Sequence, residues 1–476
     1  MPPAGVIGGL CALILAATGC AGVGDVDDSI ADARSVAVAS PRIVGADGAL
    51  TAGQSNTLLT DLTDGADQEA LLLRHRAVEE AVAGTPLTAG NATHLLRDGE
   101  GTFAAIFEEI RRAKHHINLE YYTLEDVAYD GVPLSDLLID RREAGVSVNI
   151  IYDSYGSSET PVEVFDRLRA AGVNVLEFHP YNPLDALAGG YSPNDRNHRK
   201  IMVADGKIAI VGGVNLASYY QSKVPGSEAS PEGAQADGDG APTDALPKVW
   251  RDLALRIEGP AVAQLQRLFL GHWKSGGGPA LDQTGFFPSM PVKDGEVVRI
   301  IGSSPQQEIS RFYVTLISAM RNAEQRIWLT TAYFVPTGEE LDTLEEAAEH
   351  GVDVRLMLPA DSDASEAVAI ARSQFADLLQ AGVRIFEISG IVLHSKTVTI
   401  DGVWSAVGSS NFDHRSVLFN DEVDAIVLGG DTARDLEERF EEDQEVAEEI
   451  THEAWRKRPL IDRVSDVFHR PWQSFF

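Results

Sequence analysis

The chain of 476 residues is poor in cysteine and in basic residues. Its two cysteines, Cys11 and Cys20, both precede residue 21, so the body has no disulfide framework and no cysteine-based metal site. Lys and Arg number 39 against 72 Asp and Glu, a formal net charge of −33. A surface of that sign repels nucleic acid, so no nucleic-acid partner is expected. The charge still allows a small cationic pocket for one phosphate group.

The sequence also lacks an apolar run long enough for a transmembrane helix. Residues 6–18 (VIGGLCALILAAT) form a run of 13 that is typical of a signal-peptide core, and residues 17–20 (ATGC) resemble a lipoprotein cleavage site. No Lys or Arg precedes Arg34, although signal peptides begin with basic residues. We expect residues 1–20 to direct the chain to a membrane, either as an uncleaved anchor or as a signal that leaves an exported protein lipid-anchored through Cys20.

Composition divides the rest of the chain. Residues 21–90 read as a flexible tether that ends in a helix near 67–82, and residues 276–296 read as a linker between two halves, 91–275 and 297–450. The first half contains an acidic, low-complexity insert at 222–247 that we expect to be disordered. Residues 451–476 form a basic, aromatic tail, which suits either a segment at a membrane surface or a helix packed on the body.

The two halves repeat the same helix–glycine–strand units. A helix ending near residue 144 leads through Gly145 into VSVNIIYD, and the second half answers with Gly351 and VDVRLMLP. The next unit pairs Gly172 and VNVLEF with Gly382 and VRIFEI. Each glycine stands where a helix C-cap is expected. Strands alternating with helices predict an α/β fold with a mostly parallel sheet in each half.

One motif occurs in both halves with the same spacing. HRKIMVADGKIAIVGGVN begins at His198, and HSKTVTIDGVWSAVGSSN begins 196 residues later at His394. Each reads as a strand, a turn at Asp-Gly and a return strand, which would bring a histidine, a lysine and an asparagine together. The predicted catalytic residues are therefore His198, Lys200, Asn215, His394, Lys396 and Asn411.

Acidic residues also repeat. Asp205 and Asp401 precede the turn glycines, and a structural role in the turn is favoured over direct chemistry. Asp252 follows His198 by 54 residues and Glu422 follows His394 by 28, and the difference equals the 26 residues from Ser222 to Pro247. Asp252 and Glu422 thus occupy equivalent positions, where they either orient the imidazoles or are merely structural.

Two such motifs facing one another would suit a phosphoryl transfer. One imidazole can attack phosphorus, and the other can protonate the leaving oxygen and then deprotonate the incoming alcohol or water. The lysines and asparagines would hold the phosphate oxygens, so this chemistry requires no metal or other cofactor. Because both motifs lie in one chain, we expect an active monomer.

Other polar and aromatic side chains carry weaker signals. For the strand-end aromatic residues, core packing is favoured over contact with an acyl chain or glycerol: Tyr121, Tyr122, Tyr333 and Phe334. The remaining histidines singled out lack metal-ligand spacing and are interpreted as incidental: His115, His116, His179 and His414. The extra loop at 179–197 precedes the first motif, where either substrate contacts or a simple connection are possible.

The paired motifs resemble those of the phospholipase D superfamily. NHRKIMVADGKIAIVGGVN, WRDLALRIEGPAV, TAYFVPTGEEL, LHSKTVTIDG and VGSSNFDHRS are most similar to bacterial cardiolipin synthases. The resemblance implies two α/β/α sandwich halves about a pseudo-twofold axis. It also implies metal-free transfer of a phosphatidyl group at a membrane surface, with phosphatidylglycerol as the anionic substrate, His198 as the nucleophile and His394 as acid and base.

Alternatives share the same catalytic residues. A phospholipase D would give the phosphatidyl group to water, and the sequence does not separate it from a transferase. A nuclease or other phosphodiesterase is disfavoured by the net charge of −33. A non-catalytic lipid-binding relative would have lost one of the two motifs, and both are intact.

Overall fold

The computed structural model describes residues 43–45, 48–63, 65–82, 85–180, 194–221, 249–290, 295–307, 309–362 and 364–459. The expected signal segment with Cys20, the acidic insert at 222–247 and most of the C-terminal tail lie outside these residues. So does most of the extra loop before the first motif.

The first half is built on a seven-stranded sheet. Strands β4, β7 and β8 are parallel to one another, and the remaining neighbours are antiparallel. In spatial order the strands are β8 (Asn174–Phe178), β7 (Ser147–Asp153), β4 (His116–Tyr121), β10 (Lys200–Ala204), β11 (Ile208–Gly212), β13 (Leu253–Glu258) and β3 (Leu87–Arg97).

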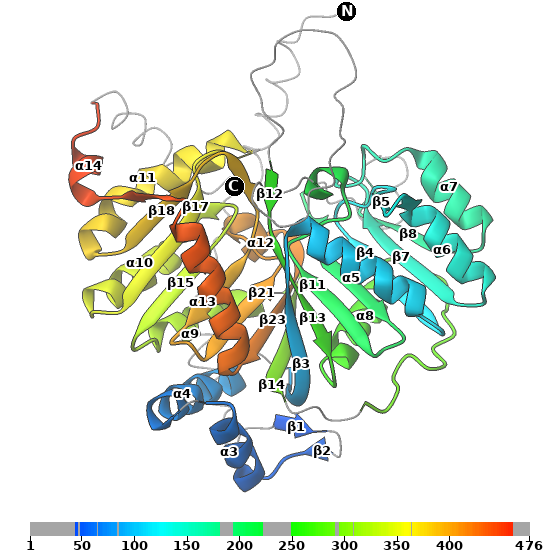
Figure 1. Ribbon diagram of the computed structural model, residues 1–476, viewed down its shortest axis with the longest axis horizontal. Coiled ribbons are helices and arrows are strands. Elements are labelled where there is room, and N and C mark those ends of the chain that lie inside the picture. The colour runs from blue at the N-terminus through cyan, green and yellow to red at the C-terminus, as the bar shows by residue number, and fades with distance from the viewer. Residues whose placement is uncertain are drawn as a thin grey trace, which may run out of the picture.

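The second half repeats this order strand for strand. Its sheet runs β18 (Arg384–Ile388), β17 (Asp353–Pro359), β15 (Arg326–Thr330), β20 (Thr397–Ile400), β21 (Trp404–Gly408), β23 (Asn420–Leu428) and β14 (Glu296–Ser303). β14 pairs with β3, so the two sheets join at the centre of the molecule and fan out to either side (Figure 1).

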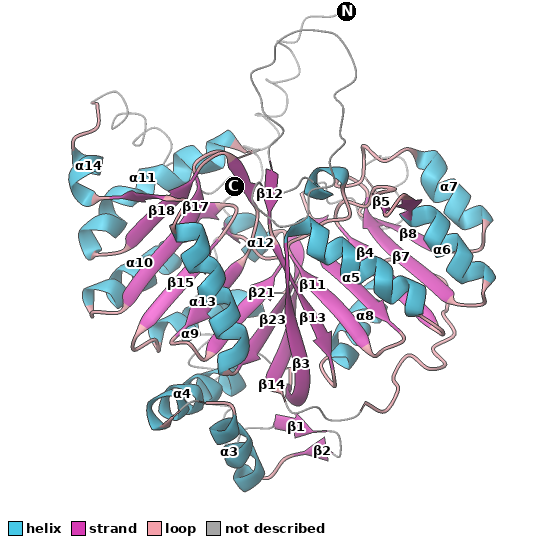
Figure 2. Ribbon diagram, in the orientation of Figure 1, coloured by secondary structure: helices cyan, strands magenta, loops and turns pink. Residues whose placement is uncertain are grey.

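Helices cover both faces of the sheets (Figure 2). On β10, Ile201 and Val203 pack in one cluster with Val262 and Leu265 of α8, whereas Met202 packs on the other side with α5. Strands buried on both faces favour apolar residues at consecutive positions, which explains the continuous run IMVA. The helices of the first half are α5 (Asp98–Arg112), α6 (Leu134–Glu143), α7 (Val162–Ala170) and α8 (Val262–Ser275). Those of the second half are α9 (Arg311–Arg321), α10 (Gly338–Glu349), α11 (Ser365–Ala381), α12 (His414–Leu418) and α13 (Gly430–Gln444).

The predicted helix–glycine–strand units are present in both halves. All four glycines between helix and strand have positive φ, between 85° and 103°, which a residue with a Cβ rarely adopts: Gly145, Gly172, Gly351 and Gly382. The prediction of a mostly parallel sheet is wrong. Only the three outer strands of each half are joined by helical crossovers, whereas the inner strands are joined by hairpins or reach back across the sheet and therefore run antiparallel.

The helix expected near residues 67–82 is present, and the region before it contains more structure than the expected tether. Strands β1 (Ile43–Gly45) and β2 (Gly48–Ala49) precede helices α3 (Ala52–Asp61) and α4 (Ala66–Val82). Leu59, Leu71 and Leu72 are buried in the core of the second half, where α4 packs on α9. β3 begins at Leu87, inside the range expected to be tether.

Two places toward the end of the chain bear on the expectations for the strand-end aromatic residues and for the tail. β15 ends at Thr330, and β16 (Phe334–Val335) is a separate strand that pairs with β22 (Phe412–Asp413), so Tyr333 and Phe334 do not end the central strand. After the edge strand β24 (Glu448–Ile450), the short helix α14 (His452–Arg456) buries Trp455 against Phe375, with ring centroids 5.0 Å apart. This part of the tail therefore packs on the body.

Candidate active site

Two hairpins, β10–β11 and β20–β21, carry the repeated motif. At their turns Asp205 and Asp401 have φ of 53° and 55°. The Asp205 carboxylate accepts the backbone N–H groups of residues 114–116 at 2.7–3.1 Å, and Asp401 accepts those of residues 324–326 at 2.7–3.2 Å. Each aspartate thus ties its turn to the start of the neighbouring central strand. These contacts favour the structural role.

Short strands cross between the halves immediately before the histidine of each motif. β9 (Arg196–Asn197) runs parallel to the start of β23, and the backbone N–H of His198 donates to the carbonyl of Asp421 at 2.9 Å. In the same way β12 (Val249–Arg251) runs parallel to β19 (Ile391–Leu393), and the N–H of His394 donates to the carbonyl of Arg251 at 2.7 Å. Each histidine is therefore placed beside the acidic residue of the opposite half.

The imidazole–carboxylate contacts are accordingly exchanged between the halves. Nδ1 of His198 lies 3.0 Å from both carboxylate oxygens of Glu422. Nδ1 of His394 lies 2.7 Å from Oδ2 of Asp252 and 2.8 Å from the Tyr220 hydroxyl. A carboxylate that accepts a hydrogen bond from Nδ1–H holds the proton on Nδ1 and leaves Nε2 unprotonated. This is the tautomer that a nucleophile or base requires.

The glycines of the motif make room for these carboxylates. A Cβ atom on Gly213 would lie 2.2 Å from Oδ1 of Asp252, so no larger residue fits at this position. The equivalent residue of the second half is Ser409, whose hydroxyl donates to Glu422. Asn420 Nδ2 donates to the same carboxylate at 3.0 Å. Every described hydrogen-bond neighbour of Glu422 is a donor to it.

Burial sets the protonation of these groups. It raises the pKa of both carboxyls, Asp252 and Glu422, to about 7. It also lowers the pKa of Lys200 to about 7. The pKa of His198 lies well below its usual value because of burial first and the neighbouring Lys200 and Lys396 second. The two carboxyls and the Lys200 ammonium thus have pKa values near neutrality, a perturbation that is common at functional sites.

The lysines and asparagines lie next to the imidazoles. Lys200 Nζ donates to the carbonyl of His198 at 2.7 Å, and Lys396 Nζ lies 2.8 Å from Nδ1 of His394 and also donates to that residue's carbonyl. Asn215 Oδ1 accepts the N–H of Thr123 at 3.2 Å. The N–H of Asn411 donates to the Ser416 hydroxyl at 3.1 Å. Both motifs are therefore complete in one place.

A cavity of about 480 Å³ opens over the two histidines. Nearly every side chain in its lining is polar or aromatic, and the lining comes from both halves: Tyr122, Tyr155, Asn194, Arg196, His198, Asn215, Tyr219, Trp250, Tyr333, Val335, Ala364, Ala367, His394, Asn411, Asp413, Arg415 and Asn420. The volume suits a small ligand or a lipid head group.

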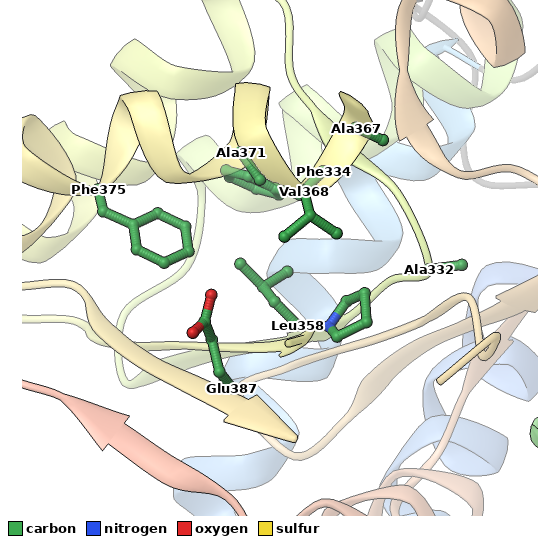
Figure 3. A pocket seen from close by; sticks show the side chains of 9 residues that line it. Ala332, Phe334, Leu358, Ala367, Val368, Ala371, Phe375 and Glu387 are labelled. Carbon is green, nitrogen blue, oxygen red and sulfur yellow. The ribbon is translucent and has the colours of Figure 1, made fainter. Parts of the chain in front are cut away.

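Another cavity, between α11 and the strands of the second half, has a different character. It encloses about 10 Å³ and is lined mainly by apolar side chains, with Glu387 at one side (Figure 3). Glu387 forms an ion pair with Arg372 at 2.8 Å. A space of that size holds about one water molecule at most. We regard it as a packing gap in the core.

The other residues that the sequence singled out fall into separate places. Tyr122 and Tyr333 line the large cavity, whereas Tyr121 is buried in the core and Phe334 stacks on Phe412. His115 and His116 lie at the start of β4, away from the cavity, and the His116 ring is tilted against that of Phe286, with centroids 4.0 Å apart. Nε2 of His179 lies 3.4 Å from Asp421, and His414 Nδ1 lies 3.3 Å from the carbonyl of Val335.

Sequence reasoning missed several residues around the site. Tyr220, Trp250 and Arg415 reach it from outside the repeated His-Lys-Asn spacing of the motif. Arg196 also lines the cavity, and it lies in the loop at 179–197 for which substrate contacts were one of two possibilities. A buried network behind His198 was also missed, in which Arg199, Glu120, Asp421 and His272 contact one another. A signal was available for Arg415, because NFDHRS departs from the equivalent NLASYY of the first half.

Within the described ranges, neither a group of metal ligands nor a membrane-spanning helix is present. No three His, Cys, Asp or Glu side chains in them are grouped as metal ligands would be. No helix within them is both long enough and apolar enough to cross a membrane.

The fold and the site define a pseudo-symmetric, phospholipase D-like enzyme with two His-Lys-Asn motifs. Residues 106–222 and 316–444 match the family described as "Cardiolipin synthase, PLD-like domain". The chain belongs to this cardiolipin synthase family of phospholipase D-like proteins, as the resemblance of its motifs had implied.

Named relatives cover most of the chain. It is 35% identical over 426 residues to the cardiolipin synthase of Geobacillus sp. (strain WCH70), a match that spans 88% of this chain and 78% of the relative. It is 32% identical over 379 residues to the probable cardiolipin synthase YwiE of Bacillus subtilis (strain 168), over 79% of this chain and 70% of the relative. The crystal structure of phosphatidylserine synthase from Haemophilus influenzae Rd KW20 shares the fold, with a TM-score of 0.59 over 86% of this chain and 98% of that one at 12% identity.

Proposed function

We propose that this protein is a phosphatidyltransferase that joins two phosphatidylglycerol molecules into cardiolipin and releases glycerol. The observation that carries the proposal is the exchanged arrangement, in which two imidazoles face one cavity and each contacts the carboxylate of the other half. The names of the relatives support the choice of lipid substrate. A membrane surface is the proposed place of action because both the substrate and the product are lipids.

The reaction proceeds in two displacements at one phosphorus. In the first, Nε2 of His198 forms a bond to phosphorus, the bond from phosphorus to the glycerol oxygen breaks, and His394 gives its proton to that oxygen. In the second, a hydroxyl of another phosphatidylglycerol attacks phosphorus, its proton returns to His394, and the phosphorus–nitrogen bond breaks. Lys200, Lys396 and the two asparagines hold the phosphoryl oxygens through both steps.

Asp252 and Glu422 are the proposed positioning residues for the two imidazoles, and Asp205 and Asp401 support the hairpins. Hydrolysis by water in the second step would give phosphatidic acid instead, so a phospholipase D is the second candidate. The polar and aromatic cavity over the histidines favours the transferase, because it offers room for an alcohol-bearing head group.

The test is incubation of the purified protein with phosphatidylglycerol vesicles, without added metal, followed by lipid analysis. Cardiolipin with an equal amount of glycerol is the expected result. Phosphatidic acid alone would establish the hydrolase, and no lipid turnover would refute both candidates. His198→Ala and His394→Ala should each abolish turnover, while trapping with labelled lipid should leave phosphate on only one of the two histidines. Substantial turnover by either variant would refute the two-histidine mechanism.

A further inference from the structure

The repeat is symmetric in its catalytic residues and asymmetric around them. With Asn215 and Asn411 aligned, Tyr219 occupies the position of Arg415. The alignment of Asp252 with Glu422 likewise places Trp250 at the position of Asn420. All four of these flanking residues line the cavity over the histidines. The two sides of one cavity therefore differ in chemistry although the reacting groups are duplicated.

One side of the cavity is aromatic. Trp250 lies 5.3 Å from the His394 ring and 4.4 Å from the ring of Tyr219, measured between centroids. Tyr333 approaches the same imidazole at 6.4 Å. This aromatic wall, made by Tyr219, Trp250 and Tyr333, belongs to the His394 side.

The other side carries two arginines. Arg415 and Arg196 both line the cavity, and the charge of Arg415 acts directly on the imidazole of His198. Arg196 stands where the second half has the buried apolar residue Val392. We call Arg196 and Arg415 the cationic wall.

Contacts with the protein fix both guanidinium groups in place. Arg415 donates to the side-chain oxygen of Asn194 at 2.8 Å and to its carbonyl at 2.9 Å. Arg196 donates to the carbonyl of His179 at 3.3 Å and lies 3.6 Å from Asp153. Guanidinium groups held in this way are suited to an oxyanion with several acceptor oxygens.

Acidic side chains near this wall also have other hydrogen-bond partners, although Asp153 faces Arg196. Asp153 accepts the backbone N–H groups of residues 155, 156 and 197 at 2.8–2.9 Å. Asp413 caps the start of α12 through the N–H of Ser416 at 2.7 Å, and burial raises its pKa to about 6. On a protein whose net charge is −33, a wall with two arginines is a specific place for an anion to approach the site.

We propose that the cationic wall binds the phosphodiester of the acceptor lipid, so that Arg196 and Arg415 select an anionic phospholipid over a neutral alcohol or water. This inference rests on the proposed function. The central phosphoryl group is already held by the lysines and asparagines of the two motifs, and the arginines provide for a second phosphate. Phosphatidylglycerol as acceptor brings such a phosphate three carbons from its reacting hydroxyl, whereas glycerol offers the same hydroxyl without it.

The experiment compares these two acceptors in one reaction. Phosphatidylglycerol vesicles are incubated with radiolabelled glycerol, and cardiolipin is measured against labelled phosphatidylglycerol, which forms when glycerol takes the phosphatidyl group. Arg415→Gln and Arg196→Gln should each lower the ratio of cardiolipin to labelled phosphatidylglycerol roughly tenfold or more. Each substitution removes a charged hydrogen bond that the anionic acceptor makes and that glycerol does not make. Arg415→Lys should recover part of the ratio. Arg384→Gln is the matched control, since Arg384 pairs with Glu449 on the outer surface.

The outcomes are distinct. An unchanged ratio in both glutamine variants, or an equal loss of both products, would overturn the role of the cationic wall while leaving the proposed function intact. If the wild-type protein forms neither cardiolipin nor labelled phosphatidylglycerol, the proposed function falls, and this inference falls with it. Labelled phosphatidylglycerol serves in every variant as the measure of a folded, competent site.

Discussion

Replacement of Glu422 by glutamine tests the exchanged imidazole–carboxylate contacts most directly. The Glu422 carboxylate accepts hydrogen bonds from Nδ1 of His198 at 3.0 Å, from Nδ2 of Asn420 at 3.0 Å and from the hydroxyl of Ser409. Glutamine has the same shape but replaces one acceptor oxygen with a donor NH2 group. Because each of these neighbours donates, the new NH2 group must face a donor. The simplest relief is for His198 to move its proton from Nδ1 to Nε2.

A proton on Nε2 blocks the nitrogen that must attack phosphorus or accept a proton. We therefore expect Glu422→Gln to lower kcat by roughly two to four orders of magnitude, as carboxylate-to-amide changes behind a catalytic histidine do, with a much smaller change in KM. Cardiolipin formation from phosphatidylglycerol vesicles measures the effect. Asp252→Asn should behave alike through His394, and Glu437→Gln, which only breaks an outer ion pair with Arg326, is the control. Retention of more than a tenth of wild-type kcat by Glu422→Gln would refute the reasoning.

Three further predictions follow from the buried charges. The pH profile of kcat/KM for the wild type should be bell-shaped with a maximum near pH 7. Burial raises the pKa of Glu422 and lowers that of Lys200, each to about 7, so the carboxylate is lost below that pH and the ammonium is lost above it. Lys200→Arg should remove the alkaline limb, and a profile that is flat from pH 5 to 9 would contradict the prediction. Burial also raises the pKa of Glu340, at the start of α10, to about 8. The pKa of Glu340 in the folded protein exceeds its pKa in the unfolded chain, so ionisation of this carboxyl destabilises the fold as the pH rises from the unfolded to the folded pKa. The Tm of Glu340→Gln should therefore increase relative to that of the wild type, by a few degrees, between pH 5 and pH 8. A Tm difference that stays constant over this range would contradict the prediction. EDTA should leave cardiolipin formation unchanged, because Lys200 and Lys396 supply the positive charge that a metal would otherwise provide at the phosphoryl group. Strong inhibition by EDTA that added metal reverses would be evidence of a metal-dependent reaction.

Local patterns in the sequence predicted what depends on local geometry. The four helix-terminal glycines were recognisable because a left-handed residue after a helix has a strong residue preference. The Asp-Gly turns of the two motifs were recognisable for the same reason. The length of the insert then placed Asp252 and Glu422 in register, although the sequence left their role open.

Features that depend on pairing across the chain could not be predicted in this way. The spacing of helices and strands indicated parallel neighbours, and it applies only to the three outer strands of each half, because the central strands pair through hairpins and long returns. The exchange of carboxylates follows from β9 pairing with β23 and β12 with β19, contacts between residues more than 100 positions apart. No local preference encodes such a pairing.

The composition of the region before Leu87 predicted a tether that ends in a helix near 67–82, and the structure confirms that helix as α4 but adds α3 and two short strands in the described part. Its small and polar residues dominate the count, yet Leu59, Leu71 and Leu72 are enough to seat two helices on the second half. A few buried leucines stabilise these helices although the average composition of the region is polar, because burial of each leucine side chain contributes about 1.5–3 kcal/mol to the free energy of folding.

The exchange of carboxylates also makes the docking of the two halves a condition for chemistry. A small rotation of one half against the other would separate both imidazoles from their carboxylates at the same time, and neither half retains a correctly oriented histidine by itself. Activity therefore reports on assembly in an all-or-none manner. Two fragments divided between α8 and β14 would each be silent alone, and they would recover turnover only when the pairing of β3 with β14 is restored.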